Sequence, residues 1–213
     1  MVSSTPCWKS AWTRVARKAA ALLCMAGAMI LAPAAFAQTP PPEVTPLQLE
    51  RVDDGLYLTA SVRFDLPPVV EDALQKGIPM FFLVEAELVR ERWYWYDKKF
   101  TYAARTLRLA FQPLTRRWRL SVAPGIGGST GLGLALSQNF DTLPEALATL
   151  QRVTRWKIAD GNELESDATY SVDFRFRLDL GQLPRPFQIG AVGQNEWTIV
   201  VNRRQRLPPE VAK

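Results

Sequence analysis

Two segments of the chain alternate strictly between apolar and polar residues. In residues 56–66 every second position is apolar, and residues 170–180 repeat the pattern with larger aromatic side chains. A period of two over this length is typical of a β-strand that buries one face and exposes the other. We therefore expect both segments to be half-buried strands, and such strands are characteristic of antiparallel sheets.

The rest of the chain predicts further strands and two short helices. Strand-like composition recurs at residues 47–52, 78–96, 100–112, 117–122, 132–140, 154–158 and 197–201. A helix is expected at 69–76, between a proline and a glycine, and another at 145–153, because Thr142 and Glu145 have capping-box spacing. We predict a mainly β fold: one antiparallel, β-sandwich-like domain with two short helices over residues 47–206.

Two local features are expected at the start of this domain. Residues 38–46 are rich in proline and lack an apolar pattern, so they predict an extended linker. The run Asp53-Asp54-Gly55 predicts a tight turn, with a positive φ angle at Gly55.

Residues 1–37 have the pattern of a secretory signal peptide. Arg14, Arg17 and Lys18 precede an uncharged apolar run at 19–31, and small residues at positions 35 and 37 form a cleavage site. The run is shorter than the roughly 20 residues that a membrane-spanning helix needs. We expect cleavage after Ala37 and a periplasmic or secreted protein. The alternative is an uncleaved N-terminal anchor, which would be the chain's one membrane contact.

Cleavage changes the charge of the protein. The full chain carries +5, but residues 1–37 hold four basic residues and no acid, so the remainder has 22 basic against 21 acidic residues. A net charge of +1 does not support binding of nucleic acid through bulk charge.

The missing residue types exclude several chemistries. The chain has no histidine, and Cys7 and Cys24 both lie in the predicted signal peptide. The mature chain can therefore form no disulfide, no Cys/His metal site and no Ser-His-Asp triad. The glycines of residues 125–133 have dehydrogenase-like spacing but follow strands rather than a βαβ unit, and the acidic run 160–167 lacks EF-hand spacing. We expect no nucleotide, cofactor or metal.

Glu85 and Glu87 stand on one face of a predicted strand. Two facing carboxylates are sufficient for glycoside hydrolysis, so a carboxylate-dependent hydrolase acting on an envelope glycan is one possible function. Their arginine neighbours favour cross-strand ion pairs instead. We expect a non-enzymatic protein and keep the hydrolase as the alternative.

The most unusual stretch is the aromatic and basic segment that starts at Arg90. Residues 90–119 hold nine basic residues against two acids, with four consecutive aromatic residues at 93–96. Basic and aromatic side chains together can bind a ligand, but six acids in residues 160–179 offer an internal match, so packing within the fold and external binding both remain open. The candidate binding surface comprises Arg90, Arg92, Trp93, Tyr94, Trp95, Tyr96, Arg117, Trp118 and Arg119.

We expect this segment to form one long antiparallel hairpin. Residues 78–96 and 100–112 would pair and turn at 97–99, with the strand 117–122 alongside and Trp118 facing the core. The arginines at 90 and 92 and at 117 or 119 would lie near the four aromatic rings, where guanidinium groups can stack.

The motifs Arg90-x-Arg92-Trp-Tyr-Trp, Arg105-Thr-x-Arg108-Leu and Trp118-Arg119 resemble an uncharacterised proteobacterial family. It is the domain of unknown function number forty-three ninety, also labelled proline-rich signal peptide protein. Phe140-Asp-x-Leu143 is similar as well, and the resemblance covers roughly residues 45–205. It implies no activity. Its members are often encoded near a two-component sensor kinase. From the signal peptide, the strand periodicity and the missing nucleophiles we expect an exported binding or accessory protein of the envelope. Its partner is unknown, and an envelope protein such as the periplasmic part of a sensor is one candidate.

Overall fold

The computed structural model describes residues 42–90, 98–126, 136–165, 168–185, 187–188 and 197–207. The predicted signal peptide, the four aromatic residues 93–96 and most of the glycine-rich loop lie outside these ranges. The described residues form a mainly β fold, which confirms the predicted antiparallel, sandwich-like domain with two short helices.

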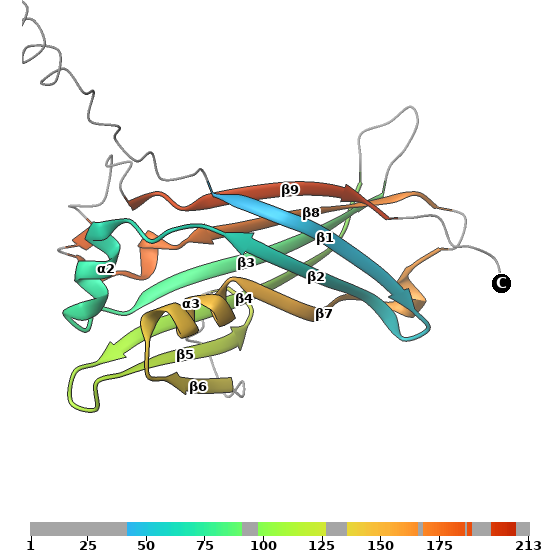
Figure 1. Ribbon diagram of the computed structural model, residues 1–213. Helices are drawn as coiled ribbons and strands as arrows, with labels where there is room; N and C mark the ends of the chain where they lie inside the picture. The colour runs from blue at the N-terminus through green and yellow to red at the C-terminus, as the bar shows by residue number, and fades with distance from the viewer. Residues whose placement is uncertain are drawn as a thin grey trace, which may run out of the picture. The chain divides into compact units, whose positions relative to one another are not determined.

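The described strands make two antiparallel sheets (Figure 1). The small sheet has the order β1-β2-β7, and the large sheet has the order β6-β5-β4-β3-β8-β9. The small sheet contains β1 (Glu43–Val52), β2 (Gly55–Arg63) and β7 (Arg152–Asp160). The large sheet contains β3 (Met80–Arg90), β4 (Lys98–Gln112), β5 (Arg117–Pro124), β6 (Leu136–Phe140), β8 (Tyr170–Leu178) and β9 (Val200–Arg206).

Short helices connect some of these strands. The α-helices are α2 (Pro68–Gln75) and α3 (Leu143–Leu150), and two 3-10 turns are η1 (Gly161–Glu163) and η2 (Leu180–Gln182). The side chain of Thr142 accepts a hydrogen bond from the backbone of Glu145, as the capping-box spacing predicts. No helix in the described ranges is long and apolar enough to span a membrane.

The apolar positions of both alternating segments face one shared core. Every second residue of β2 and of β8 is buried in the same cluster. Phe64, Phe82 and Phe176 form its aromatic centre, with ring centroids 5.3 to 5.9 Å apart. Burial of aromatic surface on this scale holds the two sheets together without a disulfide.

The inner face of the large sheet is covered by two different elements. The small sheet packs over β3 and β8, whereas α3 lies against β5 and β6 (Figure 1). Strand β7 leaves α3 directly and contacts β4, so it stands between the two covers. This division leaves a pocket on the inner face.

Three local expectations need correction. Strand β1 starts at Glu43, within the predicted linker, because its backbone pairs with β2 from that residue on. Helix α3 ends at Leu150 and β7 begins two residues later. The last strand is Val200–Arg206 rather than residues 197–201. Its sequence is mostly polar and shows no strand pattern, because it is an edge strand held by backbone pairing to β8.

Gly55 is required for a different reason from the one predicted. Positive φ angles among the described glycines occur at Gly77 and Gly125, not at Gly55. A Cβ atom at Gly55 would lie 2.4 Å from the backbone oxygen of Ala159. The glycine therefore permits close approach of β2 and β7 rather than an unusual backbone conformation.

Candidate functional site

The predicted hairpin is present, but its turn is not at residues 97–99, because Lys98 and Lys99 already belong to β4 and pair with Arg90 and Val89 of β3. The hairpin also separates the predicted binding residues. Strands β3 and β4 pair from Arg90 opposite Lys98 to Met80 opposite Leu109, and β5 pairs with β4 as expected. Arg117 pairs with Gln112, at the far end of β4 from Lys98. Fourteen residues of extended strand separate these ends by about 45 Å. Arg90 and Arg117 therefore do not belong to one surface, contrary to expectation.

Each described member of the predicted surface has a partner within the fold. Arg90 forms an ion pair of 2.7 Å with Glu165, and Arg117 forms one of 3.2 Å with Asp141. Arg119 donates through Nε to the side-chain oxygen of its cross-strand neighbour Asn139.

Trp118 is buried, as predicted, with its ring centroid 4.9 Å from that of Phe111. The Arg90–Glu165 ion pair confirms an internal match between the basic segment and the acidic region 160–179. Arg92, Trp93, Tyr94, Trp95 and Tyr96 lie outside the described residues, so their packing remains a prediction.

The outer face of the large sheet carries a polar groove instead. It has a volume of about 450 Å³ and lies over β3, β4, β8 and β9. Alternation along each strand projects its polar side chains to this face while the apolar side chains enter the core. The groove is lined by Glu85, Glu87, Tyr102, Asp173, Phe174, Arg175, Asn202, Arg203 and Arg204.

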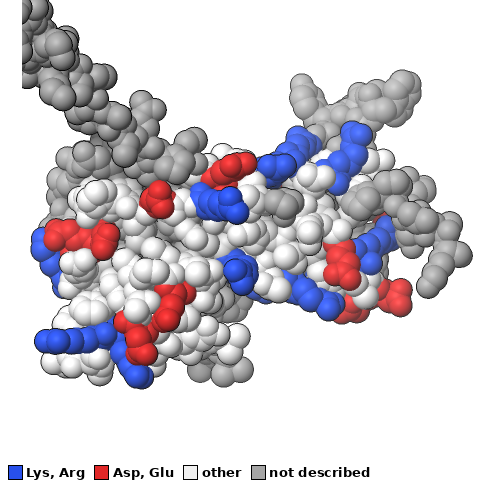
Figure 2. All heavy atoms as spheres, viewed as in Figure 1, with Lys and Arg blue, Asp and Glu red and all other residues white. Residues whose placement is uncertain are grey.

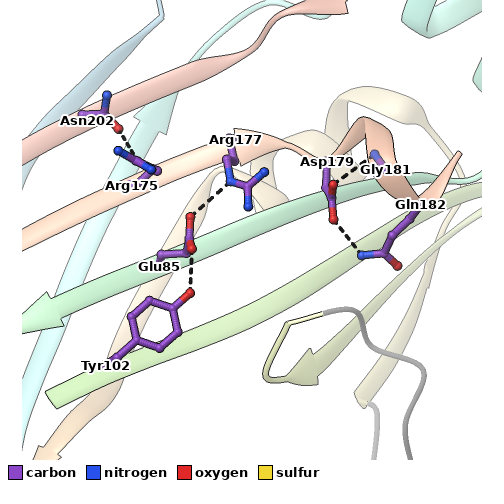
Figure 3. A network of polar contacts seen from close by, with 8 residues as sticks. All are labelled: Glu85, Tyr102, Arg175, Arg177, Asp179, Gly181, Gln182 and Asn202. Carbon is purple, nitrogen blue, oxygen red and sulfur yellow. Dashed lines mark hydrogen bonds and ion pairs between the residues drawn. The ribbon is translucent and has the colours of Figure 1, made fainter. Parts of the chain in front are cut away.

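Glu85 is the centre of a hydrogen-bonded network in this groove (Figure 3). The hydroxyl of Tyr102 donates to one carboxylate oxygen at 2.6 Å, and Nε of Arg177 donates to the other at 3.2 Å. The Glu85 side chain is only 16% exposed. Partial burial, together with the hydrogen bond to Glu85, raises the pKa of Tyr102 to about 12.

The neighbouring charges are held by cross-strand contacts. Nε of Arg175 donates to the side-chain oxygen of Asn202 at 3.1 Å, and Arg204 lies 3.5 Å from Asp173. Figure 3 shows Glu85, Arg175 and Arg177 on adjacent strands, with Asn202 beyond them on β9. The groove therefore presents charges of both signs on neighbouring strands.

Arg175 differs from the other arginines in this network. Its partner Asn202 is neutral, and the described part of the chain contains no ion pair to Arg175. Its side chain is exposed, so the guanidinium keeps a net positive charge with donors available to solvent or to a partner.

Both carboxylate oxygens of Glu85 are engaged within the fold. One accepts a hydrogen bond from the Tyr102 hydroxyl and the other accepts one from Nε of Arg177. Across the described ranges, no group of three or more His, Cys, Asp or Glu side chains gathers as a metal site.

The face of the molecule that carries the small sheet and α3 shows both signs of charge (Figure 2). On this face, basic and acidic side chains alternate in small groups among uncharged residues. This agrees with the low net charge expected for the chain without residues 1–37.

Only part of the groove was visible in the sequence. The cross-strand ion pair expected for Glu85 is confirmed by Arg177. Tyr102, Arg175 and Asn202 were not predicted as site residues. The alternation at 170–180 placed Arg175 and Arg177 on the polar face, but their neighbours on β3 and β9 depend on strand order.

The fold and the groove define an antiparallel two-sheet domain with a charged, open outer face. The chain belongs to the family described as a domain of unknown function, DUF4390, whose model matches residues 40–207. This confirms the resemblance seen in the sequence motifs. No curated protein and no solved structure shows significant similarity to the chain.

Proposed function

We propose that this chain is an exported, non-enzymatic binding protein of the cell envelope, and that the groove on the outer face of the large sheet binds a partner protein there. The observation that carries the proposal is Arg175. It is an exposed guanidinium, oriented by Asn202 and without a described carboxylate partner. An acidic side chain of a partner supplies the counter-charge, and the planar guanidinium accepts it in a defined geometry.

The other groove residues give this contact its specificity. Glu85, Glu87 and Asp173 stand beside Arg175 in the same groove. A partner that places an acid on Arg175 must keep other acids away from these carboxylates, because facing like charges are unfavourable. The proposed partner surface therefore has acidic and basic groups in a fixed order rather than a uniform charge.

The export step rests on the N-terminal sequence. The basic residues, the apolar run 19–31 and the small residues before Gln38 have the order of a signal peptide. Mass spectrometry of the protein from envelope fractions is expected to find an N-terminus at Gln38. Recovery from the cytosol with Met1 intact would refute export.

Site-specific crosslinking tests the groove directly. A photo-crosslinking amino acid replaces Tyr102, which is 50% exposed at the groove, and in a matched control it replaces Tyr57 of the small sheet. Both tyrosines donate a hydrogen bond to a carboxylate, so the two replacements perturb the fold similarly. We expect one envelope protein to be crosslinked in cells from position 102 and not from position 57.

A second variant links this adduct to Arg175. Arg175→Gln removes the charge that the partner contacts and is expected to abolish the adduct from position 102 with little change in the melting temperature. Equal adducts from positions 102 and 57, or an adduct unaffected by Arg175→Gln, would contradict the proposal. Release of sugars from an envelope glycan by the purified protein, lost in Glu85→Gln, would establish the hydrolase alternative instead.

A further inference from the structure

The inner face of the large sheet contains a second pocket, distinct from the outer groove. It has a volume of about 230 Å³ and lies where α3 and the start of β7 cover β4, β5 and β6. Figure 1 shows α3 in front of β4 and β5, with β7 leaving its C-terminal end. The small sheet covers the neighbouring part of the same face, so this pocket is the gap between two covers.

The pocket combines apolar walls with positive charge. Its walls contain the buried side chains of Val84, Leu107, Leu120 and Val153. Two arginines complete the lining, with polar Gln138, Thr149 and Thr154 and the apolar Val122 and Leu136, and none of the described lining residues is a carboxylate. An apolar cavity with a few polar groups is typical of sites for small ligands, and both charged groups in this lining, Arg105 and Arg152, are cationic.

Arg105 is the decisive residue of this pocket. It stands on the inward side of β4, opposite Val84 of β3, in line with Leu107 and Leu109. Its guanidinium carbon lies 4.9 Å from the ring centroid of Trp156. That ring is its one recorded partner in the described part of the chain, which contains no hydrogen bond or ion pair from the Arg105 side chain.

A half-buried guanidinium without an anion is costly. Burial removes water from the charge and lowers the pKa of Arg105, and the ring of Trp156 offsets only part of this loss. A ligand carboxylate would restore the missing partner with two parallel hydrogen bonds, the geometry that guanidinium favours. Arg152 at the exposed rim adds attraction for an anion.

We propose that this pocket binds a medium-chain fatty acid, with its carboxylate on Arg105 and its hydrocarbon chain against Leu107, Leu120 and Val153. The volume corresponds to about eight water molecules at roughly 30 Å³ each. Octanoate, with slightly more heavy atoms than that, fills the pocket and extends its chain end past Leu136, which is 72% exposed. This site is independent of the proposed outer groove, because it lies on the opposite face of the large sheet.

Calorimetry on the purified protein, without detergent, tests the assignment with three probes of equal chain length. Octanoate is expected to bind saturably at one site per chain. Octanol lacks the charge and octylammonium reverses it, so both are expected to bind at least about tenfold more weakly, the effect of losing one charge-assisted hydrogen-bond pair. Equal binding of the three, or no binding of octanoate, would overturn the proposal.

Variants of the pocket separate ligand binding from a purely structural role of Arg105. Arg105→Gln is expected to weaken octanoate binding at least about tenfold, whereas Arg63→Gln, an exposed arginine of the small sheet, leaves it unchanged. Octanoate is expected to raise the melting temperature of the wild type and not that of Arg105→Gln. If Arg105→Gln unfolds the protein, Val122→Phe fills the pocket without touching Arg105 and is expected to abolish octanoate binding.

A further probe identifies the source of the carboxylate. A short peptide with a free C-terminal leucine offers the same carboxylate beside a branched apolar group. We expect it to bind more weakly than octanoate, because its amide groups enter an apolar pocket without partners. Tighter, Arg105-dependent binding of the peptide would replace the fatty acid by a protein C-terminus and overturn the proposal.

Discussion

The two faces of the large sheet differ in how their charged side chains are paired. On the outer face, Glu85 receives hydrogen bonds from both Tyr102 and Arg177, so these groups satisfy one another. On the inner face, Arg105 lies against Trp156, and no described residue forms an ion pair with it. Strand β4 contributes to both, since Tyr102 and Arg105 project from opposite sides of the same strand.

The outer groups therefore form a stabilising network, whereas the inner guanidinium has no ion-pair partner among the described residues. Removing a member of the outer network leaves hydrogen-bonding groups without partners, which costs stability. Removing the inner guanidinium removes a desolvated charge, and such replacements by apolar side chains are often neutral or stabilising. The sign of the stability change therefore distinguishes the two faces, and the variants below test it in order of expected effect.

The largest difference in unfolding free energy is expected between substitutions at two adjacent positions of β8. Phe176→Ala removes a fully buried ring from the aromatic centre and should lower the free energy of unfolding by about 3–5 kcal/mol. Arg175→Gln, one residue earlier and on the exposed face, should change it by less than about 0.5 kcal/mol. Urea denaturation measures both. Similar losses would mean that the outer face is covered in solution.

A smaller loss is expected from the outer network. Glu85→Ala deprives the Tyr102 hydroxyl and Arg177 of their acceptor and should cost about 1–3 kcal/mol of unfolding free energy. Glu50→Ala, an exposed acid on β1, is the matched control and should have little effect. An Arg105→Met variant should be neutral or stabilising in the same assay. If Glu85→Ala is neutral and Arg105→Met is destabilising, our comparison of the faces is reversed.

Alkaline pH offers a test of the same network without removing it. The pKa of Tyr102 is raised from about 10 to about 12, because its neutral hydroxyl is partly buried and donates to Glu85. A raised pKa in the folded state stabilises the fold below about pH 10, and this contribution is lost as the pH rises toward 12. The stability difference between wild type and Tyr102→Phe should shrink over that interval. A constant difference would show that the hydrogen bond does not control the titration.

The smallest effect is expected at the exposed end of β3. Arg90 and Glu165 form an ion pair at 2.7 Å, but the Glu165 side chain is 53% exposed. Solvent and salt screen such pairs, so Glu165→Gln should cost less than about 1 kcal/mol, and the cost should vanish in high salt. Thermal unfolding at two salt concentrations measures it. A large, salt-independent loss would show that this end of the hairpin is buried.

Part of the site was contained in the sequence but was not recognised there. Arg105 occupies an inward position of a strand whose next inward residues are Leu107 and Leu109, so the alternation itself marks an arginine on an apolar face. The motif that contains Arg105 indicated only a resemblance to the family. The predicted proximity of Arg90 to Arg117 or Arg119 was wrong for a different reason. These positions are close in the sequence, but the long hairpin of β3 and β4 places them at opposite ends of β4.

The sequence by itself determined most of the strands, the N-cap of α3 at Thr142 and the buried faces of the alternating strands β2 and β8, because these depend on local periodicity and capping. The polar edge strand β9 has no such pattern. The sequence also revealed which nucleophiles and metal ligands the chain lacks. Only the tertiary structure decided which strands are neighbours. The order β4-β3-β8-β9 brought Tyr102, Glu85, Arg177 and Asn202 to one face, and the division of covers between α3 and the small sheet left Arg105 in a pocket. Any two strands can pair through their backbones. The strand order and the placement of the covers therefore follow from packing the whole apolar core and not from any local pattern.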